Sequence, residues 1–196
     1  MKDTEYLSIS TRIRVMENRL LTRERRERMI EARSDEEALK LLTECGYAEP
    51  EDGSSGALDR VLAQARTELF RDLSASVPIP ALVEVFQLKY DYHNAKVLVK
   101  AEAMEEDADR LLMTGGRYEP QHLAESFRRE ELRDYSPKFA QAVETAKASL
   151  EEEIDPQTAD LILDRACYEE MAEAWGSFSS SREALAVSTA CANLRE

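Results

Sequence analysis

The sequence is poor in the residues that favour strands, turns and disulfides. It has only six Gly, six Pro and three Cys, whereas Ala, Leu, Glu and Arg dominate and favour helix. Cys45, Cys167 and Cys191 are widely spaced and odd in number, which argues against a disulfide framework and favours a reducing cytosol. Because 43% of the residues are hydrophobic, a packed core is still expected. These features predict an all-α fold.

Long apolar runs are also missing. No stretch reaches the roughly 18 apolar residues that a membrane-spanning helix needs, and we expect no signal peptide. The formal net charge is −14, which argues against nucleic acid as a partner because phosphates attract basic surfaces.

The charge is distributed unevenly along the chain. Residues 1–33 contain nine Lys or Arg and six Asp or Glu, whereas the remainder contains 17 Lys or Arg and 34 Asp or Glu. The basic N-terminal segment, residues 1–33, therefore precedes an acidic body. Its alternating Arg and Glu residues are typical of a solvated helix face, and a docking surface for an acidic partner is the alternative.

Apolar periodicity and helix-end signals predict a bundle of helices with short connections. Ser34 with Glu37 forms a capping-box pattern, Gly46 is an expected helix stop, and Ser136 and Asp155 each precede a proline at a first helical position. The expected helices cover residues 4–32 (one helix or a kinked pair), 34–47, 57–73, 80–104, 120–129, 136–152, 155–175 and 181–196.

Short motifs recur about a hundred residues apart. The matched tripeptides are Leu58-Asp59-Arg60 with Leu163-Asp164-Arg165, and Asn94-Ala95-Lys96 with Asn193-Leu194-Arg195. Their common order and similar spacing indicate a duplicated helical unit. We predict a first repeat unit over residues 1–115 and a second, incomplete unit over residues 116–196.

Motifs for nucleotide, metal or nucleophilic chemistry are weak or missing. The glycine patterns of phosphate-binding loops are absent, and Gly115-Gly116 is interpreted as a helix stop with left-handed backbone. Glu119 and His122 form one ExxH element, but di-iron bundles use two, and the only other histidine is His93. We expect no catalytic residue, no cofactor and no metal ligand.

The most apolar expected helix, residues 80–104, nevertheless carries Asp91, His93 and Asn94 close together. Asp91 and Asn94 are three residues apart and so lie on one helix face, at the expected edge of the core. A catalytic carboxylate would need a companion acid or base in a cleft. A structural role is favoured, in which the two side chains satisfy helix termini or a neighbouring Arg, and a binding site is the alternative.

Five segments carry a family resemblance: YLSISTRIRVMENRLL, LDRVLAQARTELF, DYHNAKVLVKA, LDRACYEEM and ANLRE. Together they resemble the C-subunit family of archaeal and bacterial A/V-type ATPases, whose vacuolar counterpart is the d subunit. That family has repeated helical subdomains with an Asp-x-x-Asn pattern, which Asp91 and Asn94 match. Asn193 and Arg195 match in the second repeat, but Ala190 stands where the acid would be.

The resemblance implies a non-catalytic central-stalk subunit that lies on the cytoplasmic face of the membrane. Its partners would be the central-shaft subunits and the membrane proteolipid ring, with no nucleic acid. Family members usually contain three repeats, so the chain would be truncated to about two. A free-standing helical scaffold or regulatory interaction protein is one alternative, and a metal or redox enzyme built on a helical bundle is another.

The residues of the predicted structural signature would hold helices in place. They are Asp91, Asn94, Asp59, Arg60, Asp164, Arg165, Asn193 and Arg195.

Overall fold

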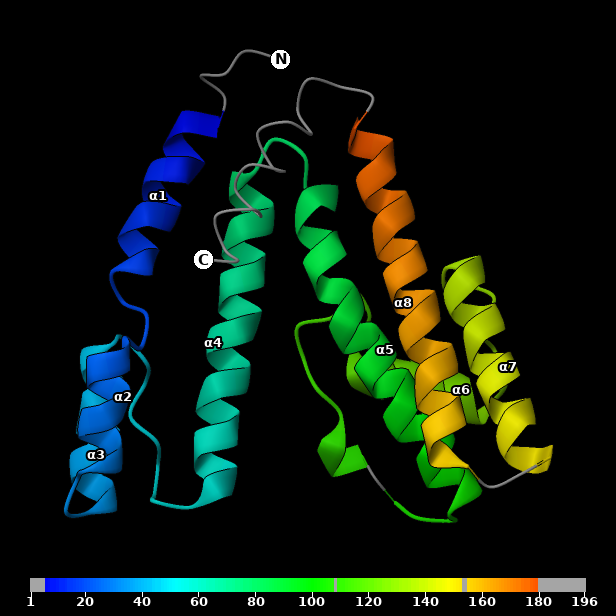
Figure 1. Cartoon of the computed structure of the whole chain (residues 1–196), viewed down its shortest axis with the longest axis horizontal. Helices are drawn as coiled ribbons and strands as arrows, with labels where there is room; N and C mark the ends of the chain where they lie inside the picture. The colour runs from blue at the N-terminus through cyan, green and yellow to red at the C-terminus, as the bar shows by residue number, and fades with distance from the viewer. Residues whose placement is uncertain (1–5, 108, 153–154, 180–196) are drawn as a thin grey trace. The chain divides into compact units, whose positions relative to one another are not determined.

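The computed structural model of the chain describes residues 6–107, 109–152 and 155–179. Within these ranges the regular structure is helical, which confirms the predicted all-α fold (Figure 1). Its elements are α1 (Leu7–Glu17), α2 (Arg23–Ile30), α3 (Asp35–Glu44), α4 (Ser55–Ser76), α5 (Ala81–Ala103), the 3₁₀ helix η2 (Asp109–Leu111), α6 (Pro120–Arg128), α7 (Pro137–Glu152) and α8 (Pro156–Ser179). The helix predicted over residues 181–196 lies outside the described residues.

Helix packing divides the chain into two compact units, with the boundary between Pro80 and Ala81. The predicted repeat units, 1–115 and 116–196, concern sequence duplication rather than packing, and they stay a prediction. Among the described helices, none is both long enough and apolar enough to cross a membrane.

The helices begin where the sequence carries capping side chains. Ser34, Ser136 and Asp155 accept hydrogen bonds from backbone N–H groups at the starts of α3, α7 and α8, at 3.3, 3.2 and 3.0 Å. Thr22 caps α2 in the same way, so the segment predicted over residues 4–32 is a pair of helices rather than one.

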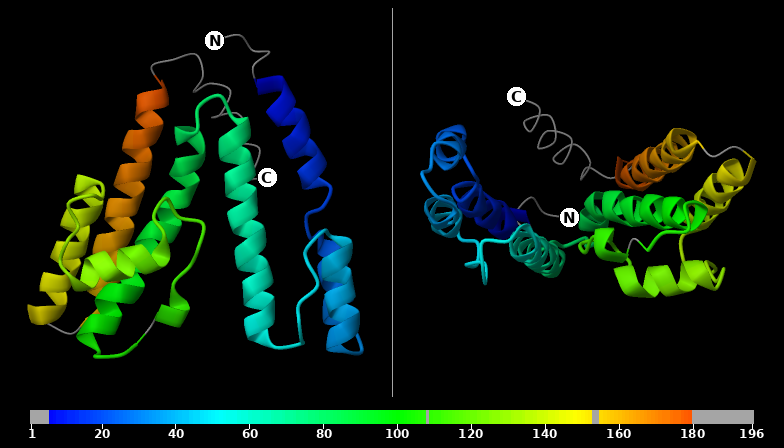
Figure 2. Two further views of the ribbon diagram at one scale, coloured as in Figure 1. Left: turned by 180° about the vertical axis from the view of Figure 1, so that it is seen from behind. Right: turned by 90° about the horizontal axis from the view of Figure 1, so that it is seen from below.

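In the first unit, α2 and α3 lie side by side (Figure 1 and Figure 2). Leu41 and Leu42 of α3 are buried, whereas Ile9 is the only buried residue of α1 and α2 has none. Gly46 follows α3 with a φ of +91°, in agreement with the predicted stop. The apolar burial of α1 to α3 is therefore concentrated in α3.

In the second unit, α5 contacts α6, α7 and α8 and forms the centre of the core (Figure 2). Apolar residues occur all around this helix, so it is buried on several faces. Phe139 of α7 has no exposed surface and meets the Tyr92 ring edge-on, with ring centroids 5.2 Å apart. The larger members of this core are Leu88, Tyr92, Leu98, Val99, Leu123, Phe127, Tyr135, Phe139, Val143, Leu150 and Leu163.

The glycine pair at residues 115–116 does not end a helix, which makes that prediction wrong. α5 already ends at Ala103, and the pair lies in the loop between η2 and α6. Gly115 does have the predicted left-handed backbone, with a φ of +98°. Its conformational freedom therefore serves a sharp turn of the loop.

Removing the Phe139 ring should open a cavity at the centre of the second unit. Phe139→Ala is expected to lower the free energy of unfolding by about 3–5 kcal/mol. Urea denaturation followed by circular dichroism measures the change. Tyr168→Ala is the matched control, because Tyr168 on α8 is 70% exposed, and it should change stability by less than about 0.5 kcal/mol. Equal losses in both variants would contradict this packing.

Candidate functional site

Three polar side chains of α5 face the loop that follows η2. Gln87, Asp91 and Asn94 are spaced by four and three residues, so they share one face of the helix, which we call the α5 polar stripe. Asp91 and Asn94 have no exposed surface, which corrects the prediction that Asp91 lies at the edge of the core. Buried polar groups of this kind require hydrogen-bond partners, and the loop supplies them.

Asn94 holds the loop at Met113 through two hydrogen bonds. Its Nδ2 donates to the Met113 carbonyl oxygen (2.9 Å), and its Oδ1 accepts from the Met113 N–H (2.7 Å). The side-chain amide thus uses a donor and an acceptor together, as a neighbouring backbone would. Nearby, His93 Nε2 lies 3.2 Å from the Leu111 carbonyl oxygen.

Gln87 holds the loop at the glycine pair. Its Nε2 donates to the carbonyl oxygens of Gly115 (3.3 Å) and Gly116 (3.1 Å). The loop approaches α5 so closely here that a Cβ atom at Gly116 would lie 2.2 Å from Asp91 Oδ1. Only glycine therefore fits at position 116 without displacing the carboxylate.

Asp91 lies between these two attachment points. Its Oδ2 accepts a hydrogen bond from Arg117 Nε (2.7 Å), and its Oδ1 accepts one from the Tyr118 N–H (3.2 Å). The buried charge is therefore paired with a guanidinium and also bonded to backbone. These partners explain why an apolar helix carries an acid at this position.

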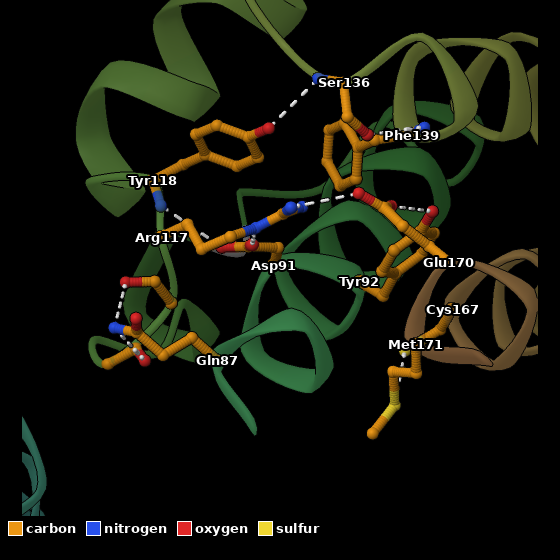
Figure 3. A network of polar contacts seen from close by, with 12 residues as sticks. Gln87, Asp91, Tyr92, Arg117, Tyr118, Ser136, Phe139, Cys167, Glu170 and Met171 are labelled. Carbon is orange, nitrogen blue, oxygen red and sulfur yellow. Dashed lines mark hydrogen bonds and ion pairs between the residues drawn. The ribbon is translucent and has the colours of Figure 1, made fainter. Parts of the chain in front are cut away.

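Arg117 extends the contact from α5 to α8 (Figure 3). Its Nη1 donates to Glu170 Oε1 (2.9 Å), and Glu170 Oε2 accepts a hydrogen bond from the Tyr92 hydroxyl (2.8 Å). Asp91, Arg117, Glu170 and Tyr92 thus form a continuous network between α5, the loop and α8, which we call the Asp91 network. Arg117 Nη2 is buried without a hydrogen-bond partner among the described residues.

The electrostatics of the Asp91 network follow from burial and from the charges within it. Burial raises the pKa of Asp91 to about 6, although the hydrogen bonds from Arg117 and the Tyr118 N–H act in the opposite direction. Burial alone would lower the pKa of Arg117, but the hydrogen bond and charge of Asp91, together with Glu170, raise it. Asp91 is therefore ionised at neutral pH beside a permanently charged partner.

A second set of contacts joins α5 to α8 and unites two of the repeated motifs. Lys96 forms an ion pair with Asp164, and Lys100 forms one with Asp160 (2.9 Å). Lys96 ends the Asn94-Ala95-Lys96 motif of the first predicted repeat, and Asp164 lies in the Leu-Asp-Arg motif of the second. The motifs therefore meet at the contact between these helices.

The other residues of the predicted signature are not part of these networks. Arg60 on α4 pairs with Glu51 (3.1 Å) at the surface of the first unit, where Asp59 is also exposed. Arg165 is exposed on α8, 3.5 Å from Glu169. Asn193 and Arg195 lie outside the described residues. Whether these positions act as a repeat signature stays a prediction.

Sequence reasoning missed Arg117, Glu170 and Gly116. Arg117 follows directly on the Gly115-Gly116 pair in the segment TGGRYEP. Such a pair of glycines could have indicated that the loop passes close to a helix. No comparable signal marks Glu170. Helix α8 carries several acidic residues, and only the fold shows which of them faces Arg117.

The ExxH element has a local structural role. Glu119 accepts a hydrogen bond from the His122 N–H (2.8 Å) and so caps α6, while the His122 Nδ1 lies 3.2 Å from the Tyr135 hydroxyl. Among the residues that the structure describes, no three His, Cys, Asp or Glu side chains are grouped as metal ligands. Burial also raises the pKa of the Cys167 thiol to about 11, which keeps it in the unreactive form at neutral pH.

Comparisons with known proteins identify the family of the chain. The chain matches the model of the family described as ATP synthase (C/AC39) subunit over residues 9–189. The chain therefore belongs to this family, which confirms the resemblance to the C subunits of A/V-type ATPases.

A curated relative is the C subunit of the V-type sodium ATPase of Enterococcus hirae. It is 28% identical to this chain over 163 residues, which make up 82% of the chain and 49% of the relative. The chain thus spans about half the length of that protein. No solved structure matches the chain.

The close approach of Gly116 to Asp91 predicts non-additive mutations. Asp91→Ala should lower the free energy of unfolding by about 1–3 kcal/mol, because it leaves Arg117 and the Tyr118 N–H without their buried acceptor. Gly116→Ala should also destabilise, but less so when Asp91→Ala has already removed the clashing carboxylate. Urea denaturation of the two single variants and the double variant measures the coupling.

Asp59→Ala on α4 is the control, since Asp59 is exposed, and it should change stability by less than about 0.5 kcal/mol. Strictly additive effects of the substitutions at positions 91 and 116 would contradict the close contact between them.

The buried Asp91 also predicts a pH effect. Its folded pKa of about 6 lies above the ordinary value of 3.8, so the folded state binds an extra proton between these pH values. Its contribution to stability therefore increases as the pH falls from 7 to 5 and is lost as the pH rises through 6. Relative to Asp91→Asn, which cannot titrate, the wild-type protein should gain about 1 kcal/mol over this range. Unfolding both proteins at both pH values tests this, and a constant difference would refute it.

Proposed function

We propose that the chain is a non-catalytic subunit of the central stalk of an A/V-type ATPase, coupling the rotor shaft to the membrane proteolipid ring during ion transport. The observation that carries this proposal is the family match over residues 9–189. In this role the chain would lie on the cytoplasmic face of the membrane and reach it through the ring.

The ion pairs that join α8 to α5 and to the loop support a mechanical role for the second unit. A part that transmits torque must resist relative movement of its helices. α5 and α8 are joined through Glu170, Asp164 and Asp160, each of which pairs with a cation of α5 or of the loop attached to it. These ties act beside a dense apolar core, and close-packed interiors transmit strain with little compression.

A non-catalytic role is supported by the state of the buried polar groups. Asp91 is paired with Arg117, and the Tyr92 hydroxyl is committed to Glu170. Active sites instead direct perturbed groups into a cleft where a substrate can meet them.

A free-standing helical scaffold is the second candidate. The two functions differ in whether the chain is found in an assembled ATPase.

Co-purification separates these candidates. A tagged chain, expressed in cells that make the ATPase, should retain both the shaft subunits and the proteolipid ring in fixed ratio after washing with high salt. An unrelated helical protein of similar net charge is the control for non-specific binding. Deletion of the chain should reduce ATP-driven ion transport more than ATP hydrolysis. Recovery of the chain without any ATPase subunit would favour the scaffold.

A further inference from the structure

The described part of the basic N-terminal segment, residues 6–33, exposes an unusual amount of apolar surface. Twelve large apolar side chains are exposed in the described part of the chain, and five of them fall within residues 7–30. They are Leu7, Ile13, Val15, Leu20 and Ile30, and Ile30 is the most exposed of the twelve at 83%. Exposed apolar surface can serve as an interaction site, so this part of the chain is a candidate for one.

The same segment carries a charge opposite to that of the body. Residues 6–33 contain eight Arg and four Glu. Some of these arginines are committed within the first unit, since Arg12 pairs with Asp72, and Arg25 donates to the carbonyl oxygen of Leu20 (3.1 Å). The structure gives no ion pair or hydrogen bond, among the described residues, to the side chains of Arg19, Arg26, Arg28 and Arg33.

The exposed residues of α2 form a preorganised face. Arg25 and Met29 are half-buried and four residues apart, so they share the side of the helix that is partly covered. Arg26 and Ile30 are exposed and are also four residues apart, so the unpaired guanidinium lies beside the apolar side chain. A partner would therefore meet a positive charge and an apolar contact at fixed spacing.

We infer that residues 6–33 of the basic N-terminal segment are the docking surface for an acidic, amphipathic helix of a partner protein. The occupant offers carboxylates to the unpaired arginines and apolar side chains to Ile30 and to the open part of α1. Charge complementarity of this kind sets the partner and its orientation. The inference rests on the proposed function in one respect: the partner would then be another subunit of the ATPase. The acidic and amphipathic character of the partner follows from the surface alone.

A membrane surface fits these observations less well. Glu24, Glu27 and Glu31 are interleaved with the arginines of this region, and they would be repelled by anionic headgroups. An interfacial helix also needs a broad apolar face, whereas α2 exposes a single large apolar residue, Ile30. Charged residues that flank an apolar contact instead suit helix pairing, in which they set the partner and its orientation.

Site-specific cross-linking tests this inference. The photo-cross-linking amino acid p-benzoylphenylalanine is placed at Ile30 in the full chain, in cells that make the ATPase. The matched control position is Leu161 on α8, which is 61% exposed but lies in the acidic body. The expected product joins Ile30 to an identified acidic helical segment, and irradiation of the Leu161 probe does not form it.

Charge reversal provides the second readout. Arg26→Glu with Arg33→Glu should reduce the cross-linked product about tenfold, and reversing the matching carboxylates of the identified segment should restore it. Arg165→Glu on α8 should leave the yield unchanged. Arg26→Gln with Arg33→Gln keeps the test valid if the reversed variant does not fold, which circular dichroism reports.

The outcomes separate the inference from the proposed function. A charge-dependent product with an acidic helix from outside the ATPase supports the inference while contradicting the proposed function. Cross-links to lipid alone, to a second copy of this chain, or to a partner whose yield ignores charge reversal would overturn the inference. So would co-purification with the ATPase without any product at Ile30.

Discussion

The second unit is organised around the buried carboxyl group of Asp91 and its contacts with Arg117 and the Tyr118 N–H. A carboxylate with no exposed surface is tolerated only because the guanidinium and the Tyr118 N–H replace the water that it has lost. That requirement fixes the path of the loop, since Arg117 must arrive from a chain that passes directly over α5. Glycine at position 116 is what makes this passage possible. The position of α8 follows in turn, because Arg117 also needs the carboxylate of Glu170.

Much of this fold could be predicted from the sequence because its signals are local. The caps at Ser34, Ser136 and Asp155 and the apolar periodicity of α5 are read from neighbouring residues, and the structure confirms them. The shared face of Asp91 and Asn94 was equally readable. The complete burial of these two side chains could not be predicted. Burial depends on which elements cover a helix face, and the loop that covers this one is distant in sequence.

The candidate site was only half predictable for the same reason. Arg117 and Glu170 are 26 and 79 positions away from Asp91, and no periodic pattern relates them to it. The repeated motifs also show the difference between a pattern in the sequence and a contact in the fold. Their recurrence was visible in the sequence, but the ion pair between Lys96 and Asp164 shows that one motif contacts the other. Similarity between segments indicates common architecture, whereas only the fold reveals which similar segments touch.

The α5 polar stripe has a mechanical consequence. Gln87, Asp91 and Asn94 bind one continuous piece of backbone, so the helix cannot rotate about its axis or slide along it without breaking all of these bonds together. A slip by one helical turn, about 5.4 Å, would place every carbonyl oxygen and N–H of the loop opposite the wrong side chain. Apolar packing alone allows small sliding movements between helices. The loop thus fixes both the position of α5 along its axis and its rotation about that axis.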